Sequence, residues 1–241
     1  MDALALEVAK SAGWPPERVA AEYHETEEAG VARLKTQKPS MALVPLPFFL
    51  SHAKDLKLTP RAQAVEKDGQ AAVTWTLVAK RGSVPSAASL GGYTLVSLAA
   101  YAPDFVRNVA LAKWGKLPKD VTFTATGQVL SALRKAASGE KVAVLLDAAQ
   151  ASSLSTLPFA DELEVVAKSP PLPGFVVCSV GAGVSQDATS RLVAGLLKMS
   201  QSPEGTAALD AVRLAKFLPV DSKQLAAARA SYAPPAKTKA R

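Results

Sequence analysis

Several residue types are rare or missing in this sequence of 241 residues. There is no isoleucine, one asparagine (Asn108) and one cysteine (Cys178). A single cysteine excludes an intramolecular disulfide and any metal site built from several cysteines. No run of about 18 apolar residues occurs, so the sequence predicts no membrane-spanning helix. The lack of isoleucine beside abundant alanine is typical of a GC-rich genome and needs no structural explanation.

The positive charge is concentrated at one end of the chain. The formal net charge is +7, but five basic residues and no acidic residue follow Asp221, so residues 1–221 hold only +2. Nucleic-acid-binding domains usually carry a basic face on the folded body, and this balance weighs against that class. Hydrophobic residues make up 49% and charged residues 20%, which indicates a globular protein and not a disordered or coiled-coil chain.

The first 80 residues alternate between helical and strand patterns. Apolar spacing and helix-start signals predict helices over residues 3–12, from Thr26 to about Lys35, and over 48–53. Short apolar or β-branched runs predict strands at 19–23, 41–44, 61–66 and 72–80. Asp68 and Gly69 separate the last two, so these are expected to pair as a hairpin.

The middle of the chain reads as strand, helix, strand, helix, strand. The strands are expected at 92–97, 121–124 and 141–146, with helices at 103–114 and 128–137. This βαβαβ order predicts a parallel sheet covered by helices. Further strands are expected at 164–168 and 175–180, with helices at 187–199 and from Ser202 onward, and residues 217–220 are expected to close the domain. Residues 232–241 are polar and proline-containing, and we expect a disordered basic tail there.

These patterns predict two α/β lobes, the second inserted into the first. We expect lobe 1 to comprise residues 1–80 and 172–231, and lobe 2 residues 81–171. Two passages of the chain between the lobes would form a hinge, with a binding cleft at the carboxyl ends of the strands.

Several segments together resemble a known family. Residues 41–48 (MALVPLPF), 75–81 (WTLVAKR), 169–174 (SPPLPG) and 202–205 (SPEG) are similar in order and spacing to the phosphate-, phosphite- and phosphonate-type substrate-binding proteins of ABC transporters. The similarity spans residues 3–222. It implies the two-lobed periplasmic-binding-protein type 2 fold, each lobe a mixed, mainly parallel sheet flanked by helices.

The resemblance also implies where the protein is located and where its natural sequence begins. Members of the family begin with a central strand behind an export signal, whereas this sequence begins at the helix that follows. We therefore expect the natural start to lie upstream, with lobe 1 lacking its first strand here. The expected location is the periplasm, free or lipid-anchored, although no signal peptide is present in the sequence as given.

Loops at strand ends supply the candidate ligand-binding residues. They are His24, Thr26, Pro45, Leu46, Ser97, Tyr101, Thr126, Gln128 and Asp147. Ser97 and Tyr101 lie in the family's ligand loop, and an acid at the place of Asp147 is expected to contact ligand or bridge the lobes. Each has a purely structural alternative: Thr26 and Thr126 can cap helices, His24 can be solvated, and residues 45–47 can be a rigid turn.

The function that follows is a solute-binding component of an ABC uptake system. It would bind a small phosphonate- or phosphate-like molecule between the lobes and deliver it to membrane permease subunits, as a monomer, without cofactor, metal or nucleic acid. The alternative is a sensory or scaffold module with a changed or lost ligand site. An enzyme is not expected, because the Ser51–Lys54 and Ser138–Lys141 pairs lack the companion motifs of serine–lysine enzymes.

Overall fold

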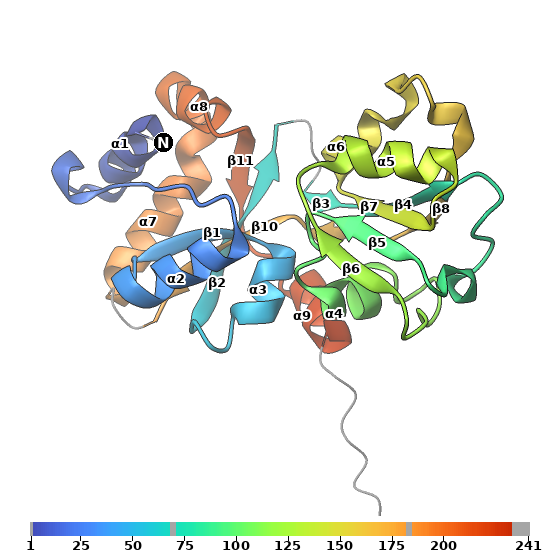
Figure 1. Cartoon of the computed structure of the whole chain (residues 1–241). Coiled ribbons are helices and arrows are strands. Elements are labelled where there is room, and N and C mark those ends of the chain that lie inside the picture. The colour runs from blue at the N-terminus through green and yellow to red at the C-terminus, as the bar shows by residue number, and fades with distance from the viewer. Residues whose placement is uncertain (1, 68–70, 182–184, 233–241) are drawn as a thin grey trace, which may run out of the picture. The chain divides into compact units, whose positions relative to one another are not determined.

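The computed structural model describes residues 2–67, 71–181 and 185–232. The chain divides into two compact units (Figure 1). Unit 1 comprises residues 1–73 and 173–221, and unit 2 comprises residues 74–172 and 222–241. The chain therefore passes between the units three times. A short ribbon pairs β3 (Ala72–Val73) with β9 (Leu172–Pro173), the segments where two of these passages occur.

The sheet of unit 1 has four strands in the order β1-β10-β2-β11. They are β1 (Met41–Pro45), β2 (Leu58–Glu66), β10 (Phe175–Val180) and β11 (Leu214–Leu218). All three pairings are antiparallel. Since β10 returns from unit 2 and enters between β1 and β2, it runs opposite to both. The expectation of a mainly parallel sheet is therefore wrong for this unit.

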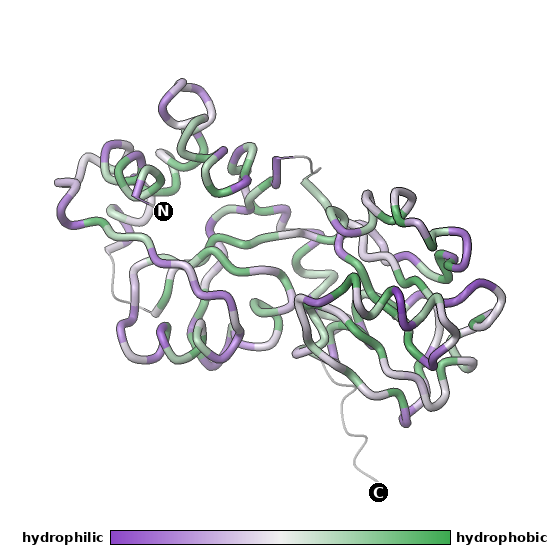
Figure 2. The backbone as a smooth tube through the Cα atoms, turned by 45° about the horizontal axis from the view of Figure 1, so that its top comes forward, coloured by the Kyte–Doolittle hydropathy of each residue, from purple (hydrophilic) through white to green (hydrophobic). Residues whose placement is uncertain are grey.

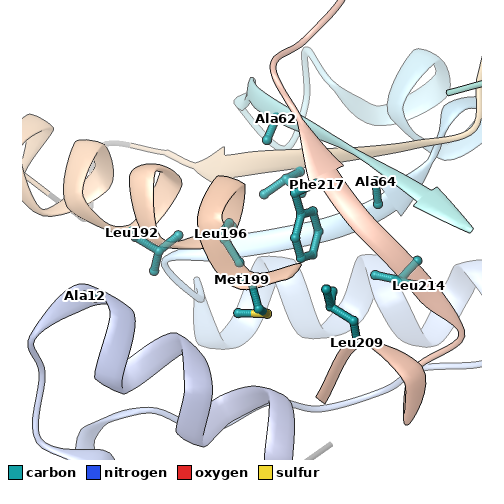
Figure 3. Packing of buried hydrophobic residues seen from close by; sticks show 10 residues of the cluster. Ala12, Ala62, Ala64, Leu192, Leu196, Met199, Leu209, Leu214 and Phe217 are labelled. Atoms are coloured by element: carbon teal, nitrogen blue, oxygen red, sulfur yellow. The ribbon is translucent and has the colours of Figure 1, made fainter. Parts of the chain in front are cut away.

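Helices cover both faces of that sheet. On one face α1 (Asp2–Ala12), α7 (Gln186–Lys198) and α8 (Pro203–Asp210) pack together, with η1 (Pro16–Arg18) and η6 (Met199–Gln201) beside them. Figure 3 shows their core, in which Leu192, Leu209 and Phe217 meet the small strand residues Ala62 and Ala64. Helices α2 (Glu27–Gln37) and α3 (Leu46–His52) pack against each other, and α3 contacts β1 and β10.

The sheet of unit 2 has five strands in the order β6-β5-β7-β4-β8. They are β4 (Thr76–Lys80), β5 (Thr94–Ser97), β6 (Thr122–Ala125), β7 (Val142–Leu146) and β8 (Leu163–Lys168). Strand β5 is parallel to β6 and β7, which confirms the predicted βαβαβ unit. Strand β4 is antiparallel to β7 and β8, so this sheet is mixed.

The longest helix over this sheet, α5 (Val129–Ser138), presents an apolar stripe. Its buried residues recur three or four positions apart, the spacing of one helix face: Val129, Ala132, Leu133, Ala136 and Ala137. Elsewhere α4 (Pro103–Phe105) runs into a π-helical turn, η3 (Val106–Ala110), on which α9 (Ser222–Tyr232) packs. The short elements are η2 (Ala87–Leu90), α6 (Ala148–Ser152), η4 (Leu154–Thr156) and η5 (Ala160–Glu162). Figure 2 shows hydrophobic residues along the central strands and hydrophilic ones on outer turns.

Two of the expected strand features are wrong. Residues 19–23 form no strand; their side chains are exposed or half-buried, and Glu22 binds Arg33 of α2 instead. The expected 61–66/72–80 hairpin is absent because β2 pairs with β10 and β11, both far along the chain. The second run also breaks into β3 and β4, which belong to different units.

The expected lobe boundaries also need correction. Residues 74–80 lie in unit 2, because β4 is an inner strand of that sheet. Residues 222–231 likewise lie in unit 2, because they form α9 on η3. The helix expected at 103–114 ends early, since Gly115 has a positive φ of 132° and residues 111–114 form turns. Of the expected tail, Tyr232 ends α9 and residues 233–241 lie outside the described residues.

Candidate functional site

Three parallel strands of unit 2 end at one edge of the sheet. Because β6, β5 and β7 are parallel neighbours, the residues that follow them lie along the same carboxyl edge. Ser97 ends β5, Thr126 follows β6 and Asp147 follows β7. The Thr126 N–H donates to the Ser97 carbonyl at 3.2 Å, which joins the first two loops directly. The structure therefore brings the predicted unit 2 residues to one edge.

Within this edge, Ser97 has a structural role. Its side chain is fully buried, and its Oγ accepts a hydrogen bond from the Ala99 N–H at 3.1 Å. This local bond shapes the loop before α4. Tyr101, in the same loop, is half-buried. Helix α4 then begins with Pro103, which has no N–H, so its first turn offers fewer donors than most helix starts.

The loop after β6 carries two polar side chains. The Oγ1 atom of Thr126 accepts the Gln128 N–H at 3.0 Å, a local turn bond, so Thr126 does not cap α5, whose N-cap position is Gln128. Gln128 precedes α5, makes no side-chain cap hydrogen bond and is exposed. Its amide is therefore free to reach a small molecule at this edge.

Asp147 begins α6 through a reciprocal capping box. Its Oδ1 accepts the Gln150 N–H at 2.7 Å, and the Gln150 side chain accepts the Asp147 N–H at 3.2 Å. Burial raises the pKa of the Asp147 carboxyl, and hydrogen bonds from the Gln150 and Ala149 backbones oppose this only in part. A carboxyl with a raised pKa holds its proton more readily than an exposed one, and a protonated carboxyl donates a hydrogen bond.

The predicted residues of unit 1 lie on two separate connections. Thr26 caps α2 by accepting the Ala29 N–H at 3.2 Å, and His24 is exposed with its Nε2 at 3.5 Å from Glu22 Oε2. Pro45 ends β1 and precedes α3. The Leu46 side chain is fully buried and its N–H donates to the Gly174 carbonyl at 2.9 Å, so neither of these groups faces solvent.

Sequence reasoning missed two buried polar groups. Nε2 of His52 lies 2.5 Å from Glu27 Oε1, which joins the end of α3 to the start of α2. The Trp75 indole N–H is buried and has no hydrogen-bond partner among the described residues. The Trp75 ring lies edge-on to Phe105, 5.4 Å between centroids. No pattern in the sequence marks its N–H as unpaired.

In both serine–lysine pairs, the serine hydroxyl makes a hydrogen bond to the preceding turn. The Ser51 hydroxyl donates to the Pro47 carbonyl and the Ser138 hydroxyl to the Lys135 carbonyl, each at 2.9 Å. Such bonds to the preceding turn are ordinary for helical serines. Across residues 2–67, 71–181 and 185–232, no cluster of three or more histidine, cysteine or acidic side chains could hold a metal ion. Within the same ranges, no helix is both long and apolar enough to span a membrane.

Solved structures of other proteins share this fold. XAC2383 from Xanthomonas citri, in a structure bound to ATP, matches with a TM-score of 0.73 at 15% identity, covering 95% of this chain and 90% of that one. PhnD1 from Prochlorococcus marinus, in complex with methylphosphonate, matches with a TM-score of 0.60 at 16% identity, covering 92% and 87%. The binding component of an ABC phosphonate transporter from Pseudomonas aeruginosa matches with a TM-score of 0.61 at 17% identity, covering 94% of this chain and 78% of that one.

These likenesses establish the fold, and a family model establishes the family. The predicted type 2 periplasmic-binding-protein fold is confirmed. A search of curated proteins gave no significant match. The model of periplasmic substrate-binding proteins of phosphonate ABC transporters matches residues 1–225. The chain therefore belongs to the family of phosphonate ABC-transporter substrate-binding proteins, as its sequence pattern predicts.

Proposed function

We propose that this chain binds a small phosphonate or related phosphorus oxyanion and delivers it to membrane permease subunits. The observation that carries the proposal is the common carboxyl edge of β5, β6 and β7, where Ser97, Thr126 and Asp147 begin adjacent loops. Ligands of open α/β sheets bind at such edges. The family match to a transporter component supports transport and does not favour a sensory or scaffold role.

The side chains at this edge suit an oxyanion bound by neutral donors. The Tyr101 hydroxyl and the Gln128 amide can each donate to a phosphonate oxygen. We propose that His24, Thr26 and Pro45 of unit 1 also contribute ligand contacts.

The remaining properties follow from the family and the charge distribution. We propose that the protein acts in the periplasm, as substrate-binding proteins of this family do, and performs no covalent chemistry. We also propose that the protein is a monomer. We propose that it does not bind nucleic acid, because residues 1–221 carry a net charge of only +2.

A ligand panel tests the function. The purified chain is titrated with methylphosphonate, phosphate, phosphite and a neutral sugar while its melting temperature is recorded. A ligand at 100 times its Kd stabilises the folded state by about 2.7 kcal/mol, which raises the melting temperature of a chain this size by several degrees. A rise with one phosphorus oxyanion and none with the sugar is expected. No rise with any member would overturn the proposal.

A pair of threonine variants tests the location of the site. Thr126 and Thr122 lie near opposite ends of β6. The Thr126 Oγ1 accepts the Gln128 N–H at 3.0 Å, and the Thr122 hydroxyl contacts Thr94 Oγ1 at 3.0 Å and the Tyr93 carbonyl at 3.5 Å. We expect Thr126→Ala to weaken the affinity for the active oxyanion about tenfold in a calorimetric titration, because the loop that presents Gln128 loses this hydrogen bond. Thr122→Ala should leave the affinity unchanged. Equal affinities for both variants would place the ligand elsewhere.

A further inference from the structure

A polar cavity of about 350 Å³ lies wholly within unit 1, at the start of α7. Its polar lining comes from Ser40, Arg61, Ser179, Gln186 and Thr189. None of these residues is among the nine predicted ligand contacts, and the cavity contains none of the loops at the carboxyl edge in unit 2. The cavity is therefore distinct from the carboxyl edge in unit 2.

A β-bulge directs Arg61 toward this cavity. Where β2 pairs with β10, Ala62 lies opposite Val177 and Pro60 opposite Cys178, so Arg61 is the extra residue. A bulge re-aims the side chain that it carries. Arg61 Nε donates to the Oγ of Ser179 at 2.9 Å, across the two strands. This bond fixes the guanidinium at the cavity wall.

The charge of Arg61 has no acidic partner among the described residues. The six ion pairs found there involve other side chains, and the closest acid along α7, Asp187, pairs with Arg191 at 3.2 Å. The two terminal guanidinium nitrogens therefore keep their N–H groups for another acceptor. A guanidinium presents these groups as a planar fork that fits a carboxylate or phosphate.

Two further groups in the cavity wall are donors. Thr189 is only 5% exposed and lines the cavity, and its hydroxyl makes no hydrogen bond within residues 2–67, 71–181 and 185–232. The next residue, Ser190, instead donates to the Gln186 carbonyl, as helical serines commonly do. At the helix start, Ser185 Oγ accepts only the Ala188 N–H, so the first-turn N–H groups of Gln186 and Asp187 have no helical partner.

We propose that this cavity is a second binding site, which takes a small molecule through its phosphate or carboxylate group. The guanidinium of Arg61, the buried Thr189 hydroxyl and the N-terminal end of α7 together provide positive charge and donors for an oxyanion. The cavity volume lies at the lower end of the range for small-molecule sites. The buried Thr189 hydroxyl gains its hydrogen bond when the anion binds.

The test records backbone and arginine side-chain N–H signals by NMR while sodium phosphate or sodium acetate is added. Sodium chloride at equal ionic strength serves as the reference. We expect saturable shifts of the Gln186–Thr189 amides and of the Arg61 Nε–H with phosphate, acetate or both. The two anions separate a phosphate site from a carboxylate site. Because the readout is residue-specific, shifts confined to the loops after β5, β6 and β7 would report on the transport site instead.

Three variants sharpen the result. Arg61→Gln should weaken binding at least tenfold, whereas Arg18→Gln, which removes one positive charge from η1 of the same unit, should not. Thr189→Val keeps the shape of the side chain and should weaken binding three- to tenfold while the protein stays folded, so the test holds even if Arg61→Gln does not fold. Absence of saturable shifts at Gln186–Thr189 with both anions, or equal binding by Thr189→Val and the parent chain, would overturn the proposal.

Discussion

At the scale of single residues, Asp147 affects stability in two opposing ways: its helix cap stabilises the fold, and the burial of its charged carboxylate destabilises it. It caps α6 through the Gln150 N–H, and its carboxyl is partly desolvated. Asp147→Ala removes the cap and should lower the free energy of unfolding by about 1 kcal/mol. Asp147→Asn keeps an acceptor for the same N–H and should cost little. Urea unfolding of the two variants at pH 7 measures the difference, and equal losses would show that the cap contributes nothing.

The raised pKa of Asp147 also predicts a pH dependence. Because the folded state holds the Asp147 proton more tightly than the unfolded state, protonation stabilises the fold. That contribution is fully present below the ordinary carboxyl pKa and is lost as the pH rises through the raised pKa. Relative to Asp147→Asn, the parent chain should therefore gain stability on acidification across that window. Unfolding free energies measured from pH 7 downward test the sign; a relative loss would contradict it.

Residue-level predictions from the sequence succeed where the partner is local. Thr26 caps α2 through a residue three positions away, and the Thr-Glu-Glu pattern predicts this. The contact of Arg61 with Ser179 spans 118 positions and depends on a bulge in the strand register. The register is a property of the assembled sheet, so no local pattern could identify Arg61 as lining a cavity.

At the scale of elements, the buried strands and helices were predictable and their partners were not. Residues 41–44, 142–146 and 175–180 are short, mostly apolar runs, and each lies in a strand. The predicted hairpin of residues 61–66 and 72–80 is wrong because it assumes that strands close in sequence pair. Strand β2 instead pairs with β10 and β11, which are distant in sequence. The predicted strand at residues 19–23 is wrong because a segment with strand-like composition forms no sheet without a neighbouring strand to pair with.

Helix packing makes a prediction from two glycines. A Cβ on Gly195 of α7 would lie 2.3 Å from Ser11 Cβ of α1, so the two helices approach too closely for a side chain there. On Gly30 of α2 the nearest atom would be Phe48 Cε2, at an ordinary 3.5 Å. Gly195→Ala should destabilise the protein by about 1–3 kcal/mol through overpacking. Gly30→Ala should stabilise it by up to about 1 kcal/mol through helix propensity.

Thermal unfolding of these two variants side by side gives the comparison. Both exchange glycine for alanine inside a helix of unit 1, so propensity alone predicts the same gain for each. Opposite signs would therefore isolate the packing of α1 on α7. A stabilised Gly195→Ala would mean that α1 shifts away without cost.

At the scale of the whole molecule, the sequence predicts two units with one inserted in the other, and the structure adds a third passage. The first two passages fall near the expected places because Pro-rich and β-branched segments mark them. The third, after Asp221, was unpredictable: residues 222–232 have a weak apolar pattern, with only Leu225 and Ala228 buried. The unit to which such a helix belongs depends on the surface that it covers, and the sequence does not show that surface.

The assignment of α9 to unit 2 leads to a prediction about local stability. Leu225 is 4% exposed on the side of α9 that packs on η3, whereas Lys223 is exposed on the same helix. Leu225→Ala should destabilise by about 2–5 kcal/mol, and Lys223→Ala should stay within about 0.5 kcal/mol of the parent. In hydrogen exchange, the Val106–Ala110 amides of Leu225→Ala should lose protection, while those of β10 in unit 1 should keep theirs. Loss of protection in β10 without any loss at η3 would contradict this assignment and indicate that α9 belongs to unit 1, as the sequence predicts.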